Sequence, residues 1–270
     1  MTEISAENGR SDTKGAHRQV EQPEKRPTKL PRWLERSIFW SILGVPTVIN
    51  RATSKVGNPP FFDNDVFPWA AEIEAGWADV REELDAILSE EETIPAFHDV
   101  APSQAGLATG RDWLTFFFYG MGERNDENCR RCPKTAALVE RIPGMTTAFF
   151  SIMSPGKELK AHRGTFNAFL RYHMGVKIPD PRLCYMTVHG TTKRWEEGKS
   201  LIFDDRYIHS AGNLSDESRV VLFVDFLRPV PAPVKAMNRL ILRLAQNVPA
   251  LQEANENLTK WNAAHRPPAK

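Results

Sequence analysis

The sequence has few cysteines and almost no net charge, and each shortage excludes a class of protein. The three cysteines, Cys129, Cys132 and Cys184, are odd in number, which argues against a fully paired disulfide framework and favours a reducing compartment. Cys129 and Cys132 could form a redox pair or half a zinc site. No second pair of this spacing follows and Pro133 comes directly after, which favours ordinary structural cysteines. The formal net charge of +1 gives no reason to expect a nucleic-acid partner.

The sequence also lacks an apolar run long enough to cross a bilayer. The best candidate, residues 38–49, has about half of the roughly twenty residues that a spanning helix needs, and Pro46 interrupts it. The polar, charged start of the chain predicts no cleavable signal peptide, so we expect a cytoplasmic protein. Basic and aromatic residues flank the apolar part of 33–51. This segment is expected either to pack on the main domain as a helix or to contact the inner face of a membrane peripherally.

The composition changes along the chain predict four regions. Residues 1–30 are polar and charged, and we expect a disordered tail because they cannot bury enough surface to offset chain entropy. Residues 31–110 are expected to form a helical extension that packs on the core, with an amphipathic helix over 69–88. Residues 111–230 are expected to form the catalytic domain, and residues 231–270 a C-terminal helix and tail.

Short apolar runs separated by turn residues predict β-structure after position 111. Aromatic and β-branched residues dominate several of these runs, and glycine- or proline-containing pairs separate them. Strands that do not alternate with long helices are typical of a barrel or jelly roll, so we expect a mainly β fold with flanking α-helices. The expected strands are 113–119, 146–153, 182–188, 200–203 and 219–226, and short helices are expected at 134–142 and 235–247.

Two histidines, His162 and His209, are candidate metal ligands because each lies at the end of a predicted strand beside a turn. His162 is followed closely by Gly164, and His209 closes a strand-like segment that leads into a predicted turn. At a barrel mouth the two rings could share a divalent metal, although imidazoles suit iron, zinc and copper alike. The usual non-haem iron triad adds a carboxylate, whose expected place is taken here by Gly164. Either the two histidines bind the metal together with water, which we favour, or Asp204 or Asp205 supplies the third ligand.

Two arginines follow these histidines and add an anion-binding character. Arg171 lies nine residues after His162, and Arg219 lies ten residues after His209. Arginine offers a planar fork to a carboxylate, and the interaction strengthens where water is excluded. Two imidazoles for a metal and two arginines for a dicarboxylic acid together predict an iron- and 2-oxoglutarate-dependent oxygenase.

The segments that carry these residues resemble the aspartyl/asparaginyl β-hydroxylase family of 2-oxoglutarate oxygenases. The similarity covers roughly residues 111–229 with matched spacing between motifs. The matching segments are 112–113, 128–135, 151–176, 195–205 and 209–225. Eukaryotic members carry a cysteine pair near the substrate site, of which only Cys129 has a counterpart here, because Ala136 stands at the second position. Farther upstream, residues 54–63 are similar to the bacterial lipid A 2-hydroxylases, a branch of the same superfamily.

This resemblance implies a double-stranded β-helix, which is a cupin-like jelly roll. It implies that His162 and His209 bind Fe(II), and that Gly164 stands where related oxygenases carry a carboxylate. The implied cosubstrate residues are Arg171 and His173 at the 1-carboxylate of 2-oxoglutarate, Ser151 and Arg219 at the distal carboxylate, and Trp113 in the wall of the pocket.

The expected function is hydroxylation of an unactivated C–H bond with Fe(II), 2-oxoglutarate and O2. The favoured substrate is an aspartyl or asparaginyl residue or a related amino-acid derivative, and the alternative is a lipid acyl chain at a membrane surface. The substrate is therefore expected to be a small molecule, a peptide or a lipid. A hypothesis from another class is a metal-binding jelly-roll module without turnover. A zinc hydrolase is disfavoured because the sequence has no His-Glu-x-x-His motif.

Overall fold

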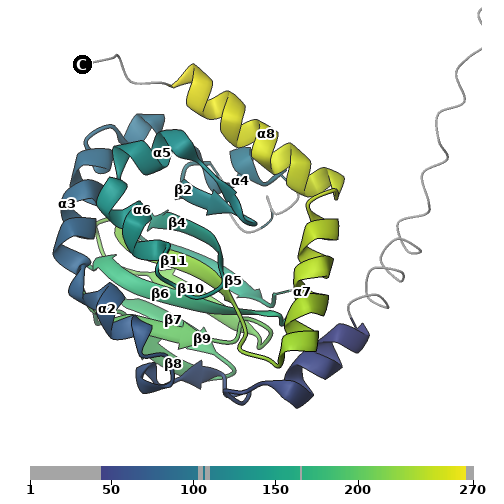
Figure 1. Ribbon diagram of the computed structural model, residues 1–270. Coiled ribbons are helices and arrows are strands. Elements are labelled where there is room, and N and C mark those ends of the chain that lie inside the picture. The colour runs from purple at the N-terminus through teal and green to yellow at the C-terminus, as the bar shows by residue number, and fades with distance from the viewer. Residues whose placement is uncertain (1–43, 103–105, 107–109, 165, 266–270) are drawn as a thin grey trace, which may run out of the picture. The chain divides into compact units, whose positions relative to one another are not determined.

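The strands form two antiparallel sheets that face each other (Figure 1). The computed structural model describes residues 44–102, 106, 110–164 and 166–265, all within one unit of residues 40–270. The larger sheet has the order β1-β9-β6-β11-β4-β2-β3, and the smaller sheet has the order β5-β10-β7-β8. The strands are β1 (Phe61–Phe62), β2 (Trp113–Gly120), β3 (Glu123–Arg124), β4 (Met145–Met153), β5 (Lys157–His162), β6 (Phe169–Lys177), β7 (Cys184–Val188), β8 (Thr191–Arg194), β9 (Ser200–Phe203), β10 (His209–Asn213) and β11 (Arg219–Leu227).

An apolar core fills the space between the two sheets. The larger sheet contributes Trp113, Met153 and Val221, and the smaller sheet contributes Leu159 and Met186. Successive residues of a strand point to opposite faces, so only every second side chain of these strands enters this core. The two packed antiparallel sheets confirm the prediction of a mainly β jelly roll with flanking helices.

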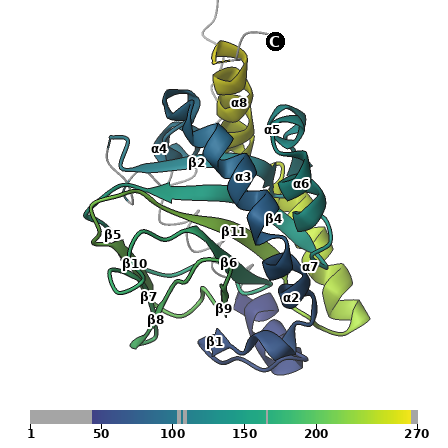
Figure 2. The ribbon, with the colours of Figure 1, turned by 90° about the vertical axis from the view of Figure 1, so that its left-hand side faces the viewer.

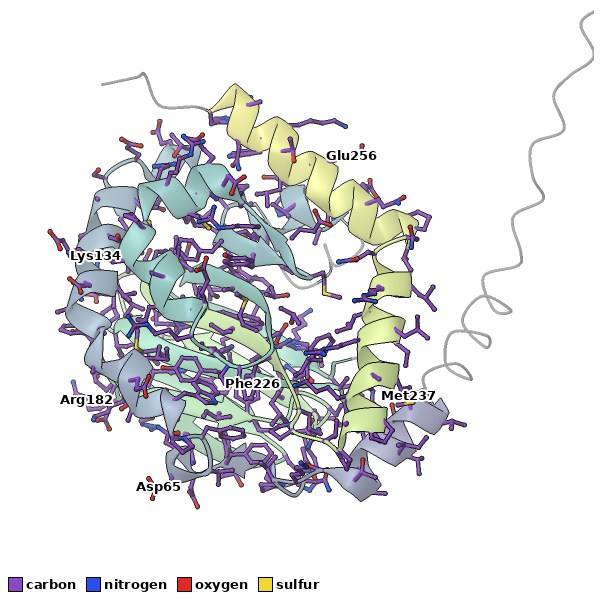
Figure 3. The ribbon with its side chains drawn as sticks, in the orientation of Figure 1. Asp65, Lys134, Arg182, Phe226, Met237 and Glu256 are labelled. Carbon is purple, nitrogen blue, oxygen red and sulfur yellow. The ribbon has the colours of Figure 1, made fainter. Side chains whose placement is uncertain are left out.

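Helices cover the outer face of the larger sheet (Figure 2). Ile73, Leu84 and Leu138 are buried there against strand residues that include Phe226. In Figure 3, Phe226 lies inside the fold, whereas Lys134 points outward, where it pairs with two acidic side chains of α3. The helices are α2 (Trp69–Ala75), α3 (Trp77–Leu88), α4 (Phe97–Val100), α5 (Asp126–Arg131), α6 (Pro133–Val139), α7 (Ala232–Ala245) and α8 (Pro249–Ala264). Short 3-10 helices lie at Asn64–Val66 and Glu91–Thr93.

The predicted helix over 69–88 is interrupted at Gly76, where α2 ends and α3 begins. The apolar period continues through the break, so the sequence pattern did not reveal it. The reason is tertiary: a Cβ atom at Gly76 would lie 2.7 Å from Leu138 Cδ2 of α6. Glycine therefore allows α6 to approach the chain at the point where the helix turns.

Three other features differ from the sequence predictions. Residues 92–110, whose prolines and glycines and lack of a period predict a loop, contain α4 (Phe97–Val100). The helix α8 (Pro249–Ala264) occupies much of what was predicted to be a tail after the C-terminal helix. Both helices lack a strong apolar stripe of their own and are held by contacts with other elements, such as the bond from Trp261 Nε1 to Thr93 O at 2.7 Å. His209 begins β10 and does not close a strand, because residues 204–208 form the turn that precedes it.

Residues 44–53 are helical and are fastened to α7 (Figure 1). The side-chain amides of Asn50 and Asn238 exchange two hydrogen bonds of 2.8 and 3.1 Å, and both residues are buried. The predicted tail of residues 1–30 and the greater part of the predicted membrane-contact segment 33–51 lie outside the described residues. Within the described part of the chain, no helix combines the length and the apolar character required to cross a membrane.

Candidate active site

The two sequence-predicted metal ligands meet at one end of the smaller sheet. His162 ends β5, His209 begins β10, and the two residues are direct partners in the antiparallel register. Their ring centroids lie 4.2 Å apart, with the rings tilted by 57°. The fold thus brings together two imidazoles that are 47 positions apart in the sequence.

Backbone hydrogen bonds orient both rings in the same way. His162 Nδ1 lies 2.7 Å from Lys160 O, and His209 Nδ1 lies 2.9 Å from Tyr207 O. Because a carbonyl oxygen can only accept, each Nδ1 carries the proton and each Nε2 keeps its lone pair. Burial lowers the pKa of His162, and burial together with the nearby Arg171 lowers the pKa of His209 to about 3. Both rings are therefore neutral near pH 7, as metal ligation requires.

His209 Nε2 is buried and has no hydrogen-bond partner among the described residues. An unpaired buried acceptor is costly, and a bound metal ion would satisfy it. Two neutral imidazoles with free Nε2 atoms match the donor set expected for Fe(II). The histidine pair therefore fits the metal that the resemblance implies.

The predicted alternatives for a third ligand each contact an arginine. Asp204 pairs with the buried Arg228 at 2.5 Å. Asp205 pairs with Arg171 through Oδ2 at 3.1 Å, whereas its buried Oδ1 has no hydrogen-bond partner among the described residues. Over the described ranges of the chain, no group of three or more His, Cys, Asp or Glu side chains is placed to hold a metal ion. Metal ligation by two histidines plus water, which the sequence analysis favoured over a third carboxylate ligand, therefore stays a prediction.

Gly164 is held beside Asp205, and this contact explains why the position has no side chain. A Cβ atom at Gly164 would lie 2.1 Å from Asp205 Oδ2, and the Gly164 amide donates to Asp205 O at 2.8 Å. Burial raises the pKa of this carboxyl to about 6, although Arg171 opposes the shift. The backbone of Gly164 is thus packed directly on a buried acidic group.

We expect Gly164→Ala to displace the Asp205 carboxylate and to destabilise the protein by about 1–3 kcal/mol, the usual cost of overpacking. Thermal unfolding measures this loss. Gly44→Ala is the matched control, because a Cβ atom at Gly44 would meet nothing within 4 Å. The double variant Gly164→Ala, Asp205→Ala should recover part of the loss. Equal melting temperatures for Gly164→Ala and the wild type would contradict the predicted clash.

Arg219 is a buried cation that lacks a counter-ion. Its side chain is 2% exposed, its guanidinium lies 4.4 Å above the ring of Trp195, and Nη2 lies 3.2 Å from Met153 Sδ. Its Nε has no hydrogen-bond partner, and no carboxylate pairs with it in the part of the chain that the structure describes. Burial lowers its pKa to about 10. A buried guanidinium without a partner is costly, so this site favours an anionic ligand.

All seven residues predicted for the site line one small inner cavity of about 40 Å³. They are Trp113, Ser151, His162, Arg171, His173, His209 and Arg219. Trp113 Nε1 donates to Ser151 Oγ at 2.9 Å, which leaves the serine hydroxyl proton available for an anion. His173 is buried, neither of its ring nitrogens has a partner among the described residues, and burial followed by the charge of Arg171 lowers its pKa. The polar groups of the cavity are therefore incompletely satisfied by the protein.

Arg171 differs from Arg219 because it already has counter-ions. Its Nε donates to Asp225 Oδ1 at 2.9 Å, and its guanidinium also pairs with Asp205 and lies 4.4 Å above the ring of Phe223. A carboxylate at this end of the cavity would share Arg171 with these two acids. The stronger unsatisfied charge is at Arg219.

An apolar groove of about 210 Å³ continues outward from the histidines. It shares Trp113, His162, Arg171 and Phe223 with the inner cavity, and its far walls come from α4, β2, β4 and α8. The additional apolar lining residues are Phe97, Val100, Ala101, Phe117, Met121, Phe149, Ala254 and Leu258. The carboxylate in this lining, Asp225, is paired with Arg171. The groove therefore suits an extended apolar group whose one end reaches His162.

Several lining residues were not identified from the sequence. Phe223 and Asp225 follow Arg219 on β11 at steps of two, so strand alternation places them on the same face and could have identified them. Trp195 lies inside a family-like segment, and no pattern assigned it to Arg219. Phe97 stacks on Trp113 with ring centroids 4.0 Å apart, but it lies on a four-residue helix with no period to read.

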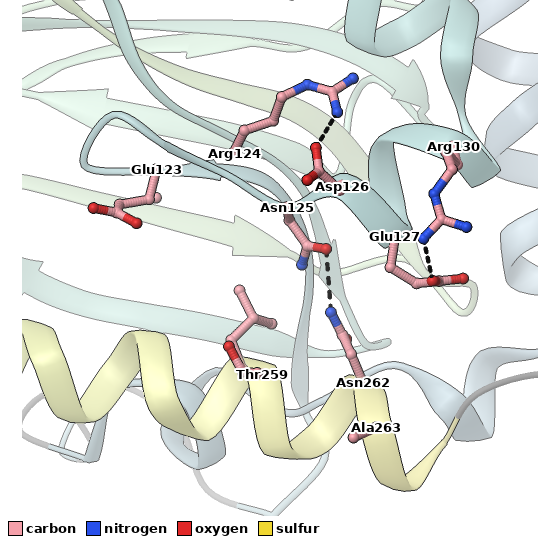
Figure 4. Close-up of a pocket in the computed structure, with 11 residues that line it drawn as sticks. Glu123, Arg124, Asn125, Asp126, Glu127, Arg130, Thr259, Asn262 and Ala263 are labelled. Carbon is pink, nitrogen blue, oxygen red and sulfur yellow. Dashed lines mark hydrogen bonds and ion pairs between the residues drawn. The ribbon is translucent and has the colours of Figure 1, made fainter.

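A second recess, of about 310 Å³, lies between the β3–α5 segment and α8 (Figure 4). Its charges are paired within the lining: Arg124 with Asp126, and Arg130 with Glu127 at 2.7 Å. It contains no histidine and none of the sequence-predicted site residues. We therefore do not assign it to the reaction.

Comparison with known proteins shows the family to which the chain belongs. The aspartyl/asparaginyl beta-hydroxylase family matches residues 74–229. An ornithine lipid ester-linked acyl 2-hydroxylase from Rhizobium tropici is 41% identical over 240 residues, which cover 88% of this chain and 84% of that protein. The aspartyl/asparaginyl beta-hydroxylase of Homo sapiens is 32% identical over 60% of this chain but only 21% of its own length. A Schizosaccharomyces pombe Cnp3 cupin domain aligns with a TM-score of 0.31 and 12% identity, covering 50% of this chain and 77% of that domain.

The fold and site thus define a jelly-roll protein of a hydroxylase class. The chain belongs to the aspartyl/asparaginyl β-hydroxylase family.

Proposed function

We propose that the protein is an Fe(II)- and 2-oxoglutarate-dependent hydroxylase that acts on an acyl chain of a lipid. The apolar groove that starts at His162 carries this proposal, because its walls are aromatic and aliphatic over α4, β2 and α8. The similarity to an ornithine lipid ester-linked acyl 2-hydroxylase over most of both chains supports carbon 2 of an ester-linked acyl chain as the target.

Six polar residues of the inner cavity have roles in this proposal. His162 and His209 would hold the metal through their Nε2 atoms. Arg219 and Ser151 would bind one carboxylate of 2-oxoglutarate, and Arg171 and His173 would face the other. When bound, Fe(II) with 2-oxoglutarate and O2 supplies the oxidising power that an unactivated C–H bond requires. The protein orients both substrates and excludes water through the aromatic residues around the cavity.

This substrate differs from the aspartyl or asparaginyl residue that the sequence resemblance favoured. Recognition of an acidic or amide side chain needs convergent polar groups that are not already paired. The outer groove contains one guanidinium, Arg171, which is paired with Asp225 and Asp205. The absence of the second family cysteine, with Ala136 in its place, points in the same direction. The acyl chain is therefore the better match for the described groove.

We expect Ala254→Phe to shorten the acyl chain that the enzyme accepts. Ala254 lines the groove from α8 and packs beside Phe149 and Phe223. If the phenyl ring displaces about three methylenes, at about 0.8 kcal/mol each, the KM for a palmitoyl lipid should rise about fiftyfold. The KM for an octanoyl lipid should change little. Mass spectrometry of the hydroxylated acyl chain and succinate release measure both substrates.

Ala264→Phe is the matched control, because Ala264 lies exposed at the end of the same helix. It should leave both KM values unchanged. If the wild-type protein loaded with Fe(II) and 2-oxoglutarate hydroxylates aspartyl peptides and no acyl lipid, the proposed substrate is wrong.

A further inference from the structure

A basic recess of about 390 Å³ lies beside the histidine pair, outside both the inner cavity and the groove. Three arginines line it: Arg51 from the helical residues 44–53, Arg163, which follows β5, and Arg206, which precedes β10. No acidic residue is among its lining residues. Three guanidinium groups around one hollow create a field that favours an anion.

The fold holds this recess in place. Arg206 Nη1 donates to Gly164 O at 2.8 Å, and the Arg51 guanidinium lies 5.9 Å from the ring centroid of Tyr207. Tyr207 is itself fixed by a 2.7 Å hydrogen bond from its hydroxyl to Asn58 O. In contrast, neither Arg51 nor Arg163 forms an ion pair with any carboxylate of the described residues. The recess is therefore a preformed site with at least two cations left for a ligand.

Asn167 adds an unsatisfied acceptor to the same recess. It is 1% exposed, and its Nδ2 donates to Thr47 O at 3.0 Å. This bond identifies the other amide atom as oxygen, because a carbonyl can only accept. Asn167 Oδ1 is buried and has no hydrogen-bond partner among the described residues. A ligand that carries both an oxyanion and a hydroxyl or ammonium donor would satisfy the whole lining.

The recess and the groove are separate hollows, and each involves residues at or next to the histidine pair. Arg163 directly follows His162, and Ile208 directly precedes His209, whereas the recess and the groove share no lining residue. Consecutive Cα atoms are about 3.8 Å apart, so Arg163 begins one residue away from His162. A lipid whose tail occupies the groove and whose carbon 2 lies at the histidines must direct its polar end away from the groove. The basic recess, which is separate from the groove and is lined by the chain neighbours of both histidines, is the candidate place for that polar end.

We propose that this recess binds the carboxylate or phosphate oxyanion of the lipid headgroup, an inference that rests on the proposed acyl-chain substrate. Exposed apolar side chains favour a headgroup at a lipid surface over a free anion. Ile208, which lines the recess, is 50% exposed, and Val45 and Val48, on the helix that carries Arg51, are 66% and 67% exposed. Guanidinium groups bordered by exposed aliphatic residues match the charged surface and apolar interior of a bilayer.

The test compares two lipids with the same acyl chains, dioctanoyl phosphatidate and dioctanoylglycerol, of which only the first is an anion. In calorimetric titration, wild-type protein should bind dioctanoyl phosphatidate more tightly than dioctanoylglycerol, by at least about tenfold for each arginine that contacts the phosphate. Arg51→Gln and Arg163→Gln should each lower the affinity for phosphatidate about tenfold and leave turnover of dioctanoylglycerol unchanged. Both residues are exposed, so folding should be unaffected. Arg182→Gln, at a side chain that is 86% exposed and pairs locally with Asp180, is the control.

The outcomes separate this inference from the proposed function. If the two arginine variants keep the wild-type preference for phosphatidate, the headgroup site is wrong even when acyl hydroxylation is observed. If inorganic phosphate alone binds as tightly as phosphatidate, the recess serves a free anion and the headgroup assignment is also wrong. If phosphatidate binds through these arginines but no acyl chain is hydroxylated, the recess stands and the proposed reaction fails.

Discussion

Replacing His209 with alanine is expected to remove the metal from the protein and to reduce 2-oxoglutarate turnover to the level of the metal-free enzyme. His162 and His209 are direct cross-strand partners and can share an ion, and the described residues contain no group of three or more His, Cys, Asp or Glu side chains that could replace one of them. Loss of an indirect partner of a metal ligand already costs about 10–100-fold in affinity, and loss of one of two protein ligands should cost more. The same result is expected for His162→Ala.

Iron content after gel filtration measures this effect independently of activity, and succinate release measures the reaction. His265→Ala is the matched control, because His265 is exposed at the end of α8 and stacks on Trp261. It should retain the iron content of the wild type. Equal iron content in the His209→Ala and wild-type proteins would exclude the histidine pair as the metal site.

The second large effect is expected at Arg219, where binding and stability should change in opposite directions. Arg219→Met removes a buried, unpaired guanidinium and leaves a side chain of similar length. Loss of a buried charge pair with a ligand typically costs about 2–5 kcal/mol, so 2-oxoglutarate affinity should fall roughly thirtyfold to several thousandfold. The free energy of unfolding without ligand should not fall, because a charge without a partner has been removed from the interior.

Arg228 provides the matched control, since it is also 2% exposed but fully paired. Its guanidinium contacts Asp204 at 2.5 Å, Asn167 O at 2.9 Å and Gly57 O at 3.1 Å. Arg228→Met should therefore destabilise the protein by about 3–5 kcal/mol, because it leaves the buried Asp204 carboxylate unpaired. Chemical denaturation and calorimetric titration of 2-oxoglutarate measure the two quantities. Equal destabilisation by both substitutions would show that Arg219 has a structural role and no ligand-binding role.

Local patterns in the sequence determined five of the eleven strands in the described residues and the identity of the candidate ligands, but they did not predict the ranges of β5, β6 or β10, which carry His162, Arg171 and His209. Apolar runs predicted β2, β4, β7, β9 and β11, because these strands are largely buried and a short apolar run is a local property of the sequence. The types and spacing of His162, His209, Arg171 and Arg219 indicated metal and carboxylate chemistry, since only a few side chains can perform either role. None of this information required contacts between distant parts of the chain.

Only the tertiary structure decided how these residues are used. The antiparallel register of β5 and β10 places one imidazole opposite the other, and the two acids beside Arg171 distinguish it from the unpaired Arg219. The groove exists because α8 packs its Ala254 side against aromatic residues of β2, β4 and β11. These properties depend on contacts between segments that are far apart in the sequence. Composition and period report what each segment can bury, but they do not report which segment it meets.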